Sequence, residues 1–585
     1  MNNLKKKIEK IFSVNDYFFL SGELKKIYPI IVDYYSDKFS TEFKISKAFY
    51  EYALNASLQS ITYLFFYKLK KFQNVISIKD LSINQFNYDL TPNTPYDHDK
   101  NLTDISYNIK LDKLFSIEND YHDYPDRNNP KEKIFNNDIF RNYLFETSKL
   151  ERLVLRANKI LFFILYPFFK KKNIILSMAN SDNSFRKYLF YIGSNINIIS
   201  RRKYLNSKIN IEKRNRIFDN SDFLQFDVFK NILKSFEINE SDFLIIEKKL
   251  IKFYKYLIPI QLLEKSQDNY FLVKKNIIKF NPSFILSGSG TNFDDDLINA
   301  CAYEANIKII RAQHGAFYGY LQHMRWSHHE IPLSNEFITW GWSNLKDTYS
   351  FEHVNFVPLP SPWLSERKTM WKNYNINFSN NYFDILYMPQ CVKYFDVMPI
   401  NCSFVNRDIL PNFKFFFFDL MISLNKNNIK TLVKYYNIES FNALSSVHEI
   451  LKNKFNETYF VHNNFDKGLS KTLLSKAKIV IWDQPGTGFL ECISSNIPTM
   501  VFWDRSYSKE FKECEQYFNE LEKIGLLSNN IESLVKEISL YLNSPTKWIN
   551  TKYNTNTIFE FKKMFCDTDK FWWKKWRNYL KQIND

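Results

Sequence analysis

The chain has 585 residues, of which 45% are hydrophobic and 24% charged, which indicates a folded protein of several domain-sized units rather than a disordered chain. Its formal net charge of +16 favours contact with polyanions such as anionic lipid or phosphorylated substrates. Nucleic acid is not expected as a partner, because the sequence has no aromatic-and-basic RNP pattern, zinc-finger spacing or basic helical arm.

The first 170 residues predict a mainly helical start to the chain. Residues 17–20 are apolar and predict a short strand ending at Ser21-Gly22, whereas residues 43–72 have a helical pattern. Residues 87–130 are rich in Asn, Asp, Pro and Tyr, which predicts a long irregular connection. The longest apolar run, 160–169, is about half as long as a membrane span requires. It predicts a buried helix end, with a shallow membrane contact as the alternative.

From residue 173 onward, apolar strand patterns alternate with helical ones. A long amphipathic helical region covers 222–279. Strands that alternate with helices at this spacing predict a parallel sheet. The predicted strands of this first series are 173–177, 196–199, 283–287, 307–310, 337–340 and 356–360.

Three consecutive aspartates, Asp294 to Asp296, follow the strand 283–287. With Asn292 as the N-cap, they would lie in the first turn of a helix, where carboxylates interact favourably with the helix dipole. A metal-binding motif is the alternative interpretation, and the strongly helical sequence that follows favours the cap.

The segment Arg311-Ala-Gln-His-Gly315 follows the apolar strand 307–310. Ligands bind at the carboxyl ends of the strands in open α/β sheets, and histidine moves protons near neutral pH. Gln313, His314 and Gly315 are therefore predicted to contact a ligand or take part in catalysis. A histidine-rich surface loop is the alternative. Ser287 and Ser289, at a neighbouring strand end, are candidate substrate contacts.

A Lys- and Asn-rich stretch, 365–381, interrupts the pattern, and a second α/β series follows it. Two Rossmann-like parallel-sheet halves in one chain predict a cleft between them, which suits an enzyme with two substrates. The predicted strands of the second series are 383–387, 431–433, 458–461, 478–481 and 499–502. The predicted domains are 1–365 with helical insertions at 43–72 and 222–279, then 381–555, then a helix within 556–585 that packs back on the first domain.

The segment 478–491 predicts a second ligand loop. A strand ends at Asp483, and a turn that contains Gly486, Thr487 and Gly488 opens a helix, whose first amides could hold a phosphate. Glu491 lies one turn beyond Thr487 and could reach a ribose hydroxyl. An ordinary turn, in which the glycines serve geometry alone, is the alternative.

His462 ends the preceding predicted strand and could face the same ligand.

Four stretches together resemble a known family: Gln313-His-Gly315, Glu330, Phe337-Ile-Thr-Trp-Gly-Trp342, and Asp483 through Glu491 with Pro498. They are similar to transferases of bacterial surface-carbohydrate (O-antigen) biosynthesis, a family best known from spirochaetes. The length of the chain also fits. More distantly, the arrangement resembles GT-B glycosyltransferases that use CMP-activated acidic sugars, in which His462 and the loop 486–491 would take the motif positions.

The resemblance implies a GT-B-like glycosyltransferase. Its carboxyl-terminal half would bind the nucleotide-sugar donor, and its amino-terminal half would hold a glycan or lipid-linked glycan acceptor. His314 would act as base or phosphate donor, and Glu330 would orient it or act as the base itself. The sequence shows neither metal-ligand spacing nor a phosphate-binding P-loop, so no metal and no cofactor are expected.

Two alternatives remain open. A CDP-polyol phosphotransferase would build a teichoic-acid-like polymer on a related two-domain scaffold. A non-catalytic transferase-fold protein of polysaccharide assembly would agree with two departures from the family patterns. Ala316 stands where the first family has glycine, and Asn463 stands where the CMP-sugar enzymes have proline.

Several features bear on location. The lysine-rich start has no apolar core, so no signal peptide is expected, and six scattered cysteines suit a reducing cytoplasm. The segment 571–577 interleaves aromatic and basic residues as interfacial helices do. We therefore expect a cytoplasmic protein. Packing of the last helix on the first domain is favoured for this segment, with peripheral contact to the anionic inner membrane face as the alternative.

Overall fold

The computed structural model describes most of the chain, and the predictions for 87–130, 160–169, Ser289 and Asn292 lie wholly or largely outside the described residues. The described ranges are 14–72, 90–94, 110–111, 173–176, 181–188, 196–198, 208–219, 226–288, 293–322, 325–343, 351–371, 382–392, 404–405, 409–462 and 468–584, with a few isolated residues between them.

The first half contains a six-stranded parallel sheet in the order β2-β1-β3-β4-β5-β6. Its switch point, where the strand order changes direction, lies between β1 and β3. At such a point the ends of adjacent strands leave room for a ligand. The strands are β1 (Asn173–Ile175), β2 (Ile196–Ile198), β3 (Phe284–Ser287), β4 (Lys308–Ala312), β5 (Glu336–Thr339) and β6 (Asn355–Pro358).

The second half contains another six-stranded parallel sheet, in the order β11-β10-β7-β12-β13-β14. Numbered along the chain this is the order 3-2-1-4-5-6 of dinucleotide-binding sheets, with its switch point between β7 and β12. The strands are β7 (Phe383–Met388), β10 (Thr431–Val433), β11 (Tyr459–Val461), β12 (Ala477–Trp482), β13 (Thr499–Phe502) and β14 (Leu527–Ser528). A separate two-residue ladder joins β8 (Cys391–Val392) and β9 (Phe404–Val405).

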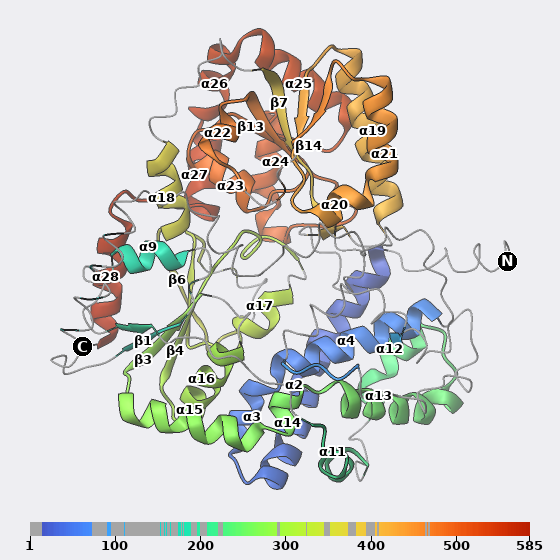
Figure 1. The fold of residues 1–585 in the computed structure, drawn as a ribbon, viewed down its shortest axis with the longest axis vertical. Coiled ribbons are helices and arrows are strands. Elements are labelled where there is room, and N and C mark those ends of the chain that lie inside the picture. Colours follow the sequence, from blue (N-terminus) through green and yellow to red (C-terminus); the bar gives the residue numbers. More distant parts are fainter. Residues whose placement is uncertain are drawn as a thin grey trace.

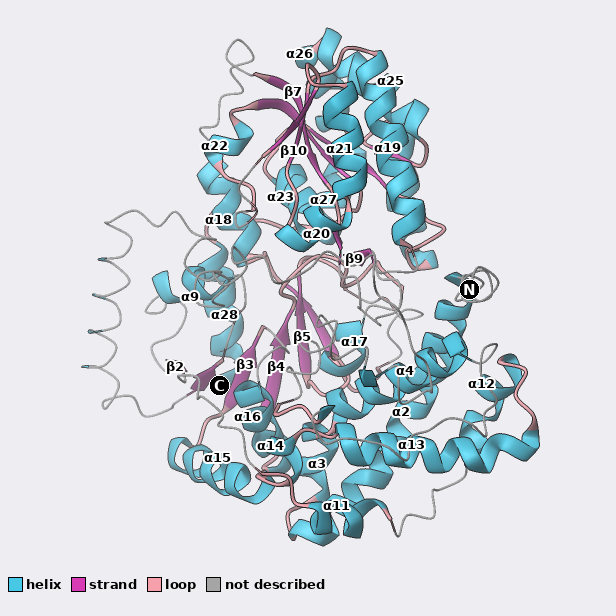
Figure 2. Ribbon diagram, turned by 45° about the vertical axis from the view of Figure 1, so that its right-hand side comes forward, coloured by secondary structure: helices cyan, strands magenta, loops and turns pink. Residues whose placement is uncertain are grey.

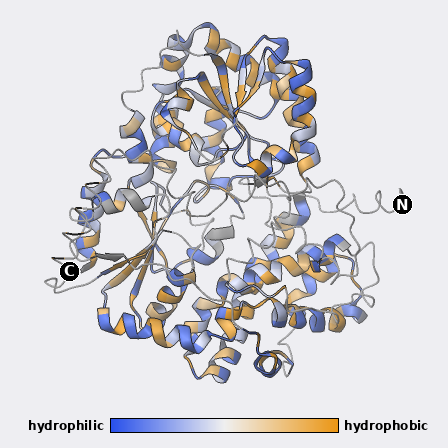
Figure 3. Ribbon diagram, in the orientation of Figure 1, coloured by the Kyte–Doolittle hydropathy of each residue, from blue (hydrophilic) through white to orange (hydrophobic). Residues whose placement is uncertain are grey.

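Alternate residues of the first sheet enter two different cores, as the two-residue period of a strand requires. Ile285 and Ile309 face one core, whereas Leu286 and Ile310 face the other. Both faces are therefore covered, and the strands of both sheets are largely hydrophobic (Figure 3). The predicted α/β class is confirmed: the chain has two Rossmann-like parallel sheets, with helical insertions in its first half.

The helices of the first half gather beside its sheet (Figure 1). The strand predicted at residues 17–20 is wrong, because these residues belong to the 30-residue helix α2. Leu20 and Leu24 are both fully buried, one turn apart on the helix, so the apolar residues follow a helical period. The helices are α2 (Val14–Phe43), α3 (Lys47–Ala53), α4 (Asn55–Phe72), α9 (Asp182–Lys187), α11 (Ile211–Phe218), α12 (Lys230–Ser235), α13 (Phe243–Leu257), α14 (Ile260–Leu263), α15 (Ser266–Phe280), α16 (Phe293–Glu304) and α17 (Arg325–Glu330).

Helices of the second half cover its sheet (Figure 2). The stretch 365–381, predicted to interrupt the pattern, begins inside helix α18, and residues 372–381 lie outside the described residues. The helices are α18 (Pro362–Trp371), α19 (Leu410–Lys426), α20 (Ile438–Ala443), α21 (Ser445–Lys454), α22 (Lys471–Leu474), α23 (Thr487–Ser494), α24 (Glu515–Lys523), α25 (Ile531–Asn543), α26 (Pro545–Tyr553) and α27 (Asn556–Phe565). Within the described part of the chain, no helix is both long and apolar enough to span a bilayer.

The last helix, α28 (Trp572–Asn584), packs on the first half (Figure 1). Trp572 and Trp576 are buried in the core on one face of the first sheet, together with Phe185 of α9. The indole N–H of Trp576 donates to the carbonyl of Pro360 at 2.9 Å. Two of the three tryptophans of this basic segment, Trp572 and Trp576, therefore contribute to the protein core, whereas Phe571 is exposed.

Candidate functional site

Gln313 fixes the loop that follows β4. Its side-chain oxygen accepts from the backbone N–H of Trp340 at 3.0 Å and from the indole N–H of Trp342 at 2.8 Å. Its amide nitrogen donates to the carbonyl of Gly315 at 2.8 Å. Because these three bonds use both ends of a buried amide, they favour a role for Gln313 in holding the loop rather than in contacting a ligand.

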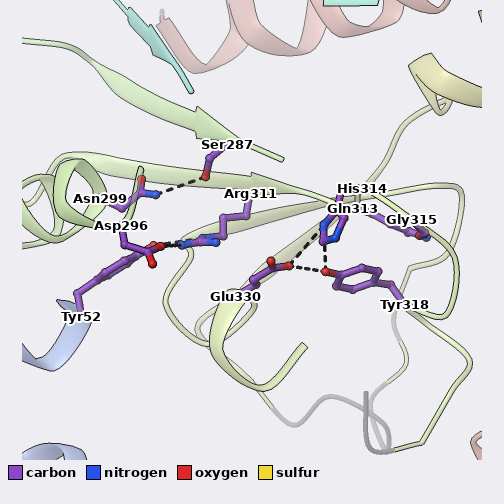
Figure 4. Close-up of polar contacts among 10 residues, drawn as sticks. All are labelled: Tyr52, Ser287, Asp296, Asn299, Arg311, Gln313, His314, Gly315, Tyr318 and Glu330. Atoms are coloured by element: carbon purple, nitrogen blue, oxygen red, sulfur yellow. Dashed lines mark hydrogen bonds and ion pairs between the residues drawn. The ribbon is translucent and has the colours of Figure 1, made fainter. Parts of the chain in front are cut away.

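His314, Tyr318 and Glu330 form a polar cluster at this loop (Figure 4). The Tyr318 hydroxyl lies 3.1 Å from Nδ1 of His314 and also donates to Oε2 of Glu330. Nδ1 and Oε2 are 3.8 Å apart. Glu330 ends helix α17, so the cluster joins that helix to the end of β4.

The charges around this cluster favour a neutral imidazole beside an ionised carboxylate. Burial lowers the pKa of His314, an effect that Glu330 opposes and the charge of Arg311 reinforces. Burial by itself would raise the pKa of Glu330, but His314, His329, Arg311 and the bond from Tyr318 together hold it below its usual value. Such a pair can accept a proton from a hydroxyl group near neutral pH.

Arg311 links this cluster to the helical part of the first half (Figure 4). Its guanidinium contacts the hydroxyl of Tyr52 on α3 and lies 3.5 Å from the carboxylate of Asp296. Asp294, Asp295 and Asp296 lie in the first turn of α16, as predicted. Among the described residues, no group of three or more His, Cys, Asp or Glu side chains is placed to hold a metal ion.

Ser287 is fully buried at the end of β3 and lies 3.5 Å from the side-chain amide of Asn299. It therefore faces the core in this structure. Ser289 lies outside the described residues.

The two predicted ligand loops contact each other across the two halves. The backbone N–H of Ala316 donates to the hydroxyl of Thr487 at 2.9 Å. The hydroxyl of Tyr320 donates to the carbonyl of Pro485 in the same loop. Gly486 caps helix α23, and a Cβ atom there would lie 3.3 Å from the ring of Phe317. The carboxyl end of β4 therefore faces the carboxyl end of β12.

Asp483 lies at the switch point of the second sheet. Its Oδ2 accepts from the Tyr387 hydroxyl and from the backbone N–H of Gln390, both at 3.0 Å. Its Oδ1 is buried and has no hydrogen-bond partner among the residues that the structure describes. Burial raises the pKa of this carboxyl to about 7, although the two hydrogen bonds oppose the rise. An unpartnered acceptor at this point is available to a ligand.

Glu491 is buried one turn beyond Thr487 on helix α23. Its carboxylate lies 2.7 Å from Nε of Arg367 on α18 and accepts from the indole N–H of Trp371 at 3.1 Å. Burial raises its pKa, and both partners oppose the rise. These contacts favour a structural ion pair over the predicted contact with a ribose hydroxyl, because the face that continues from Thr487 packs against α18.

Two further predicted ligand contacts, His462 and Gly488, have structural surroundings of their own. His462 follows β11, an edge strand separated from β12 by β10 and β7. Its backbone N–H donates to the carbonyl of Val433 at 2.9 Å. At Gly488, a Cβ atom would lie 2.1 Å from the ring of Trp482, so this glycine allows the ring to pack beneath the helix.

The sequence does not single out Tyr318 and Arg311, although both contribute to the cluster. Tyr318 follows His314 by four residues in a loop, where no regular period indicates that the two side chains meet. Arg311 reads as an ordinary strand residue. Arg311 is only 2% exposed. A buried arginine would have indicated a functional residue, but the sequence does not show that both faces of its strand are covered.

Comparison with known proteins gives a family match over nearly the full length. The model of the LIC12162 family transferases matches residues 16–580. None of the curated proteins is significantly similar to the chain.

Among solved structures, the UDP-GlcNAc 2-epimerase from Neisseria meningitidis bound to UDP-GlcNAc is 10% identical (TM-score 0.36), covering 71% of this chain and 99% of that one. A UDP-GlcNAc 2-epimerase from Methanocaldococcus jannaschii is 12% identical (TM-score 0.39), covering 70% and 99%. A glycosyltransferase from Rickettsia africae is also 12% identical (TM-score 0.36), covering 71% and 98%. Similarities of this size carry no information about the substrate.

Proposed function

The chain belongs to the LIC12162 family of transferases, and from this premise we propose that it is a glycosyltransferase of bacterial surface-polysaccharide (O-antigen) synthesis. It would transfer a sugar from a nucleotide-activated donor to a glycan acceptor. The contact between the loops after β4 and β12 carries the proposal. It brings the polar cluster of His314 and Glu330 close to the amino terminus of helix α23.

The donor would bind to the second half, at the switch point between β7 and β12. The first amides of α23 are suited to a phosphate group, and Thr487 still has its own hydroxyl proton to donate. The unpartnered Oδ1 of Asp483 would accept a hydrogen bond from the nucleoside or sugar. The resemblance of His462 and the loop 486–491 to the CMP-sugar enzymes makes a CMP-activated acidic sugar our preferred donor.

The acceptor, a glycan or lipid-linked glycan, would lie against the first half. His314 would take the proton from its hydroxyl as that oxygen attacks the anomeric carbon, and Glu330 would stabilise the imidazolium that forms. The departing phosphate would leave against the amino terminus of α23, where the helix dipole favours negative charge. Neither step requires a metal ion. We place this reaction in the cytoplasm, at the inner face of the membrane if the acceptor is lipid-linked.

Two measurements test the proposal. A thermal-shift screen with CMP, CDP, UDP and GDP should stabilise the wild-type chain with at least one nucleotide, and less so for Thr487→Val. Transfer to glycan should fall by about 10²–10⁴-fold in His314→Gln and in Glu330→Gln. His353→Gln is the matched control, because its imidazole lies at an exposed site, where it bonds to the carbonyl of Pro332 and packs beside Phe351. Unchanged transfer in both cluster variants would overturn the catalytic assignment.

A further inference from the structure

Tyr318 connects the two ionisable groups of the cluster. Its hydroxyl bonds to both His314 and Glu330, although those two side chains are 3.8 Å apart at their nearest atoms. Tyr318 is fully buried, and its ring packs edge-on against the imidazole with the centroids 5.4 Å apart. The phenol is therefore held in one position between its two partners.

The number of protons in the cluster decides which group donates. A phenol carries one O–H proton, and an ionised carboxylate only accepts. The Tyr318 hydroxyl donates to Oε2 of Glu330, and the permanent charge of the nearby Arg311 favours the ionised form of that carboxylate. Tyr318 therefore donates its proton to Glu330 and can only accept at its other contact. That contact is Nδ1 of His314, so Nδ1 carries a proton and Nε2 carries the lone pair.

We propose that Tyr318 is a positioning residue that fixes His314 as the Nδ1–H tautomer and so makes Nε2 the basic nitrogen. This inference rests on the proposed function, in which Nε2 removes the proton of the acceptor hydroxyl. The O–H bond of the acceptor breaks as the N–H bond forms at Nε2. Its oxygen then bonds to the anomeric carbon as the bond from that carbon to phosphate breaks, and the phosphate oxygen keeps the electron pair.

The charged groups around the imidazole come from three elements. Glu330 on α17, whose Oε2 lies 3.8 Å from Nδ1, favours the imidazolium by its charge, whereas Arg311 on β4 opposes it. Arg311 is itself held by Tyr52 on α3 and Asp296 on α16. From the second half, the uncharged Thr487 at the start of α23 lies beside Gly315. Tyr318 bonds to both His314 and Glu330 without adding a charge of its own.

The tautomer can be measured without a substrate. The full chain is labelled with ¹⁵N-histidine, and the His314 signal is assigned by its loss in His314→Gln. We expect one neutral tautomer in the wild type, protonated at Nδ1. In Tyr318→Phe we expect a mixture of tautomers and a lower imidazole pKa. Tyr254→Phe is the matched control, because it removes another buried hydroxyl that bonds to Thr62 at 2.6 Å.

A wild-type imidazole protonated at Nε2, or an unchanged tautomer in Tyr318→Phe, would overturn the inference. Glu330→Gln separates charge from geometry, since it keeps an acceptor oxygen for Tyr318 and should lower the imidazole pKa while it preserves the tautomer.

Activity then separates this inference from the proposed function. Tyr318→Phe should lower kcat by about tenfold or more with little change in KM. A changed tautomer together with full transfer would leave the positioning role standing and refute His314 as the base.

Discussion

At the residue scale, Asp483 shows how burial prepares a carboxyl group for a ligand. One of its oxygens accepts two hydrogen bonds from the chain, whereas the other has none. A buried acceptor without a partner destabilises the empty protein, because it has lost its hydration without gaining a bond. A ligand that donates a hydrogen bond to Oδ1 of Asp483 would recover this loss of stability. The unpartnered oxygen of Asp483 therefore lowers the stability of the empty protein while it favours the binding of a ligand.

We predict that Asp483→Asn stabilises the empty protein in a pH-dependent way. The pKa of the folded carboxyl is raised to about 7 by burial, so the wild-type chain loses stability as the pH rises from the unfolded pKa toward 7. The free energy of unfolding falls by about 1.4 kcal/mol per pH unit in this range. The total fall is about 4 kcal/mol, and it levels off above pH 7. The asparagine variant lacks it, so unfolding curves of the two proteins should diverge between pH 4.5 and 8.

Asp268→Asn, which removes an exposed carboxylate on α15, controls for the change in net charge. Parallel pH profiles for wild type and Asp483→Asn would contradict the prediction. Nucleotide binding should weaken in the same variant, because the amide presents a donor where the ligand requires an acceptor.

The residues of the two loops could be predicted from the sequence to different extents. His314 and Thr487 follow strands with clear apolar patterns, so their position at the carboxyl edges followed from the strands alone. Gln313 and Glu491 shared those patterns, yet their side chains turn toward Trp342 and Arg367. Which partner a buried side chain selects depends on neighbours that are distant in the sequence.

At the element scale, helix α23 joins the proposed donor site to the linking helix α18. Its amino terminus meets the loop of the first half, and Glu491, one turn further along the helix, forms the ion pair with Arg367. Both side chains are less than a tenth exposed. A buried pair of this kind is costly to break, since the remaining charge is left without compensation.

We therefore predict that Glu491→Gln lowers the free energy of unfolding by about 3–5 kcal/mol, because Arg367 remains buried and unpaired. Urea unfolding measures this. Glu520→Gln at the exposed Lys523–Glu520 pair is the matched control, with an expected loss of about 0–1 kcal/mol.

Nucleotide affinity, measured well below the melting temperature, should be retained in Glu491→Gln. A selective loss of that affinity with intact stability would restore the contact with ribose that the sequence suggested.

Most strands of the two sheets were predictable because they contain short apolar runs, such as Phe284-Ile-Leu286 in β3 and Ile479-Val-Ile-Trp482 in β12. The exceptions have physical causes. Residues 17–20 form an apolar run too short to separate a strand from a helix by period, and the structure resolves it as part of α2. The two-residue strands β8, β9 and β14 are too short to give any pattern.

At the scale of the whole molecule, the carboxyl-terminal helix connects the end of the chain to the first sheet. Trp576 is 1% exposed and packs edge-on against Phe185 with centroids 4.9 Å apart. Trp573 is only partly buried and stacks on Tyr188 at 5.8 Å. The tryptophans of this segment therefore serve packing, whereas Phe571 and the lysines are exposed at the surface.

We predict that Trp576→Ala destabilises the protein by about 3–5 kcal/mol, because it opens a cavity in the core of the first half. Trp573→Ala should cost distinctly less, since its ring is already in contact with water. Thermal unfolding compares the two variants. If both melted at the temperature of the wild-type protein, α28 would be dispensable for the first half.

Flotation with anionic liposomes tests the membrane alternative separately. Trp573→Ala is the informative variant in that experiment, because the ring of Trp573 is only partly buried.

The halves are connected at two places that lie side by side. The chain passes from the first sheet to the second through α18 and returns between α27 and α28. A backbone bond from Ser361 to Asp567, and a bond from Asp569 to the Ser365 hydroxyl, join the two crossings. Further backbone bonds tie the loop after β4 to the second half, because the N–H of Gln322 donates to the carbonyl of Lys509 and the N–H of Phe511 donates to the carbonyl of Tyr320. A movement of one half relative to the other would therefore have to break backbone bonds beside the candidate site as well as at the crossings.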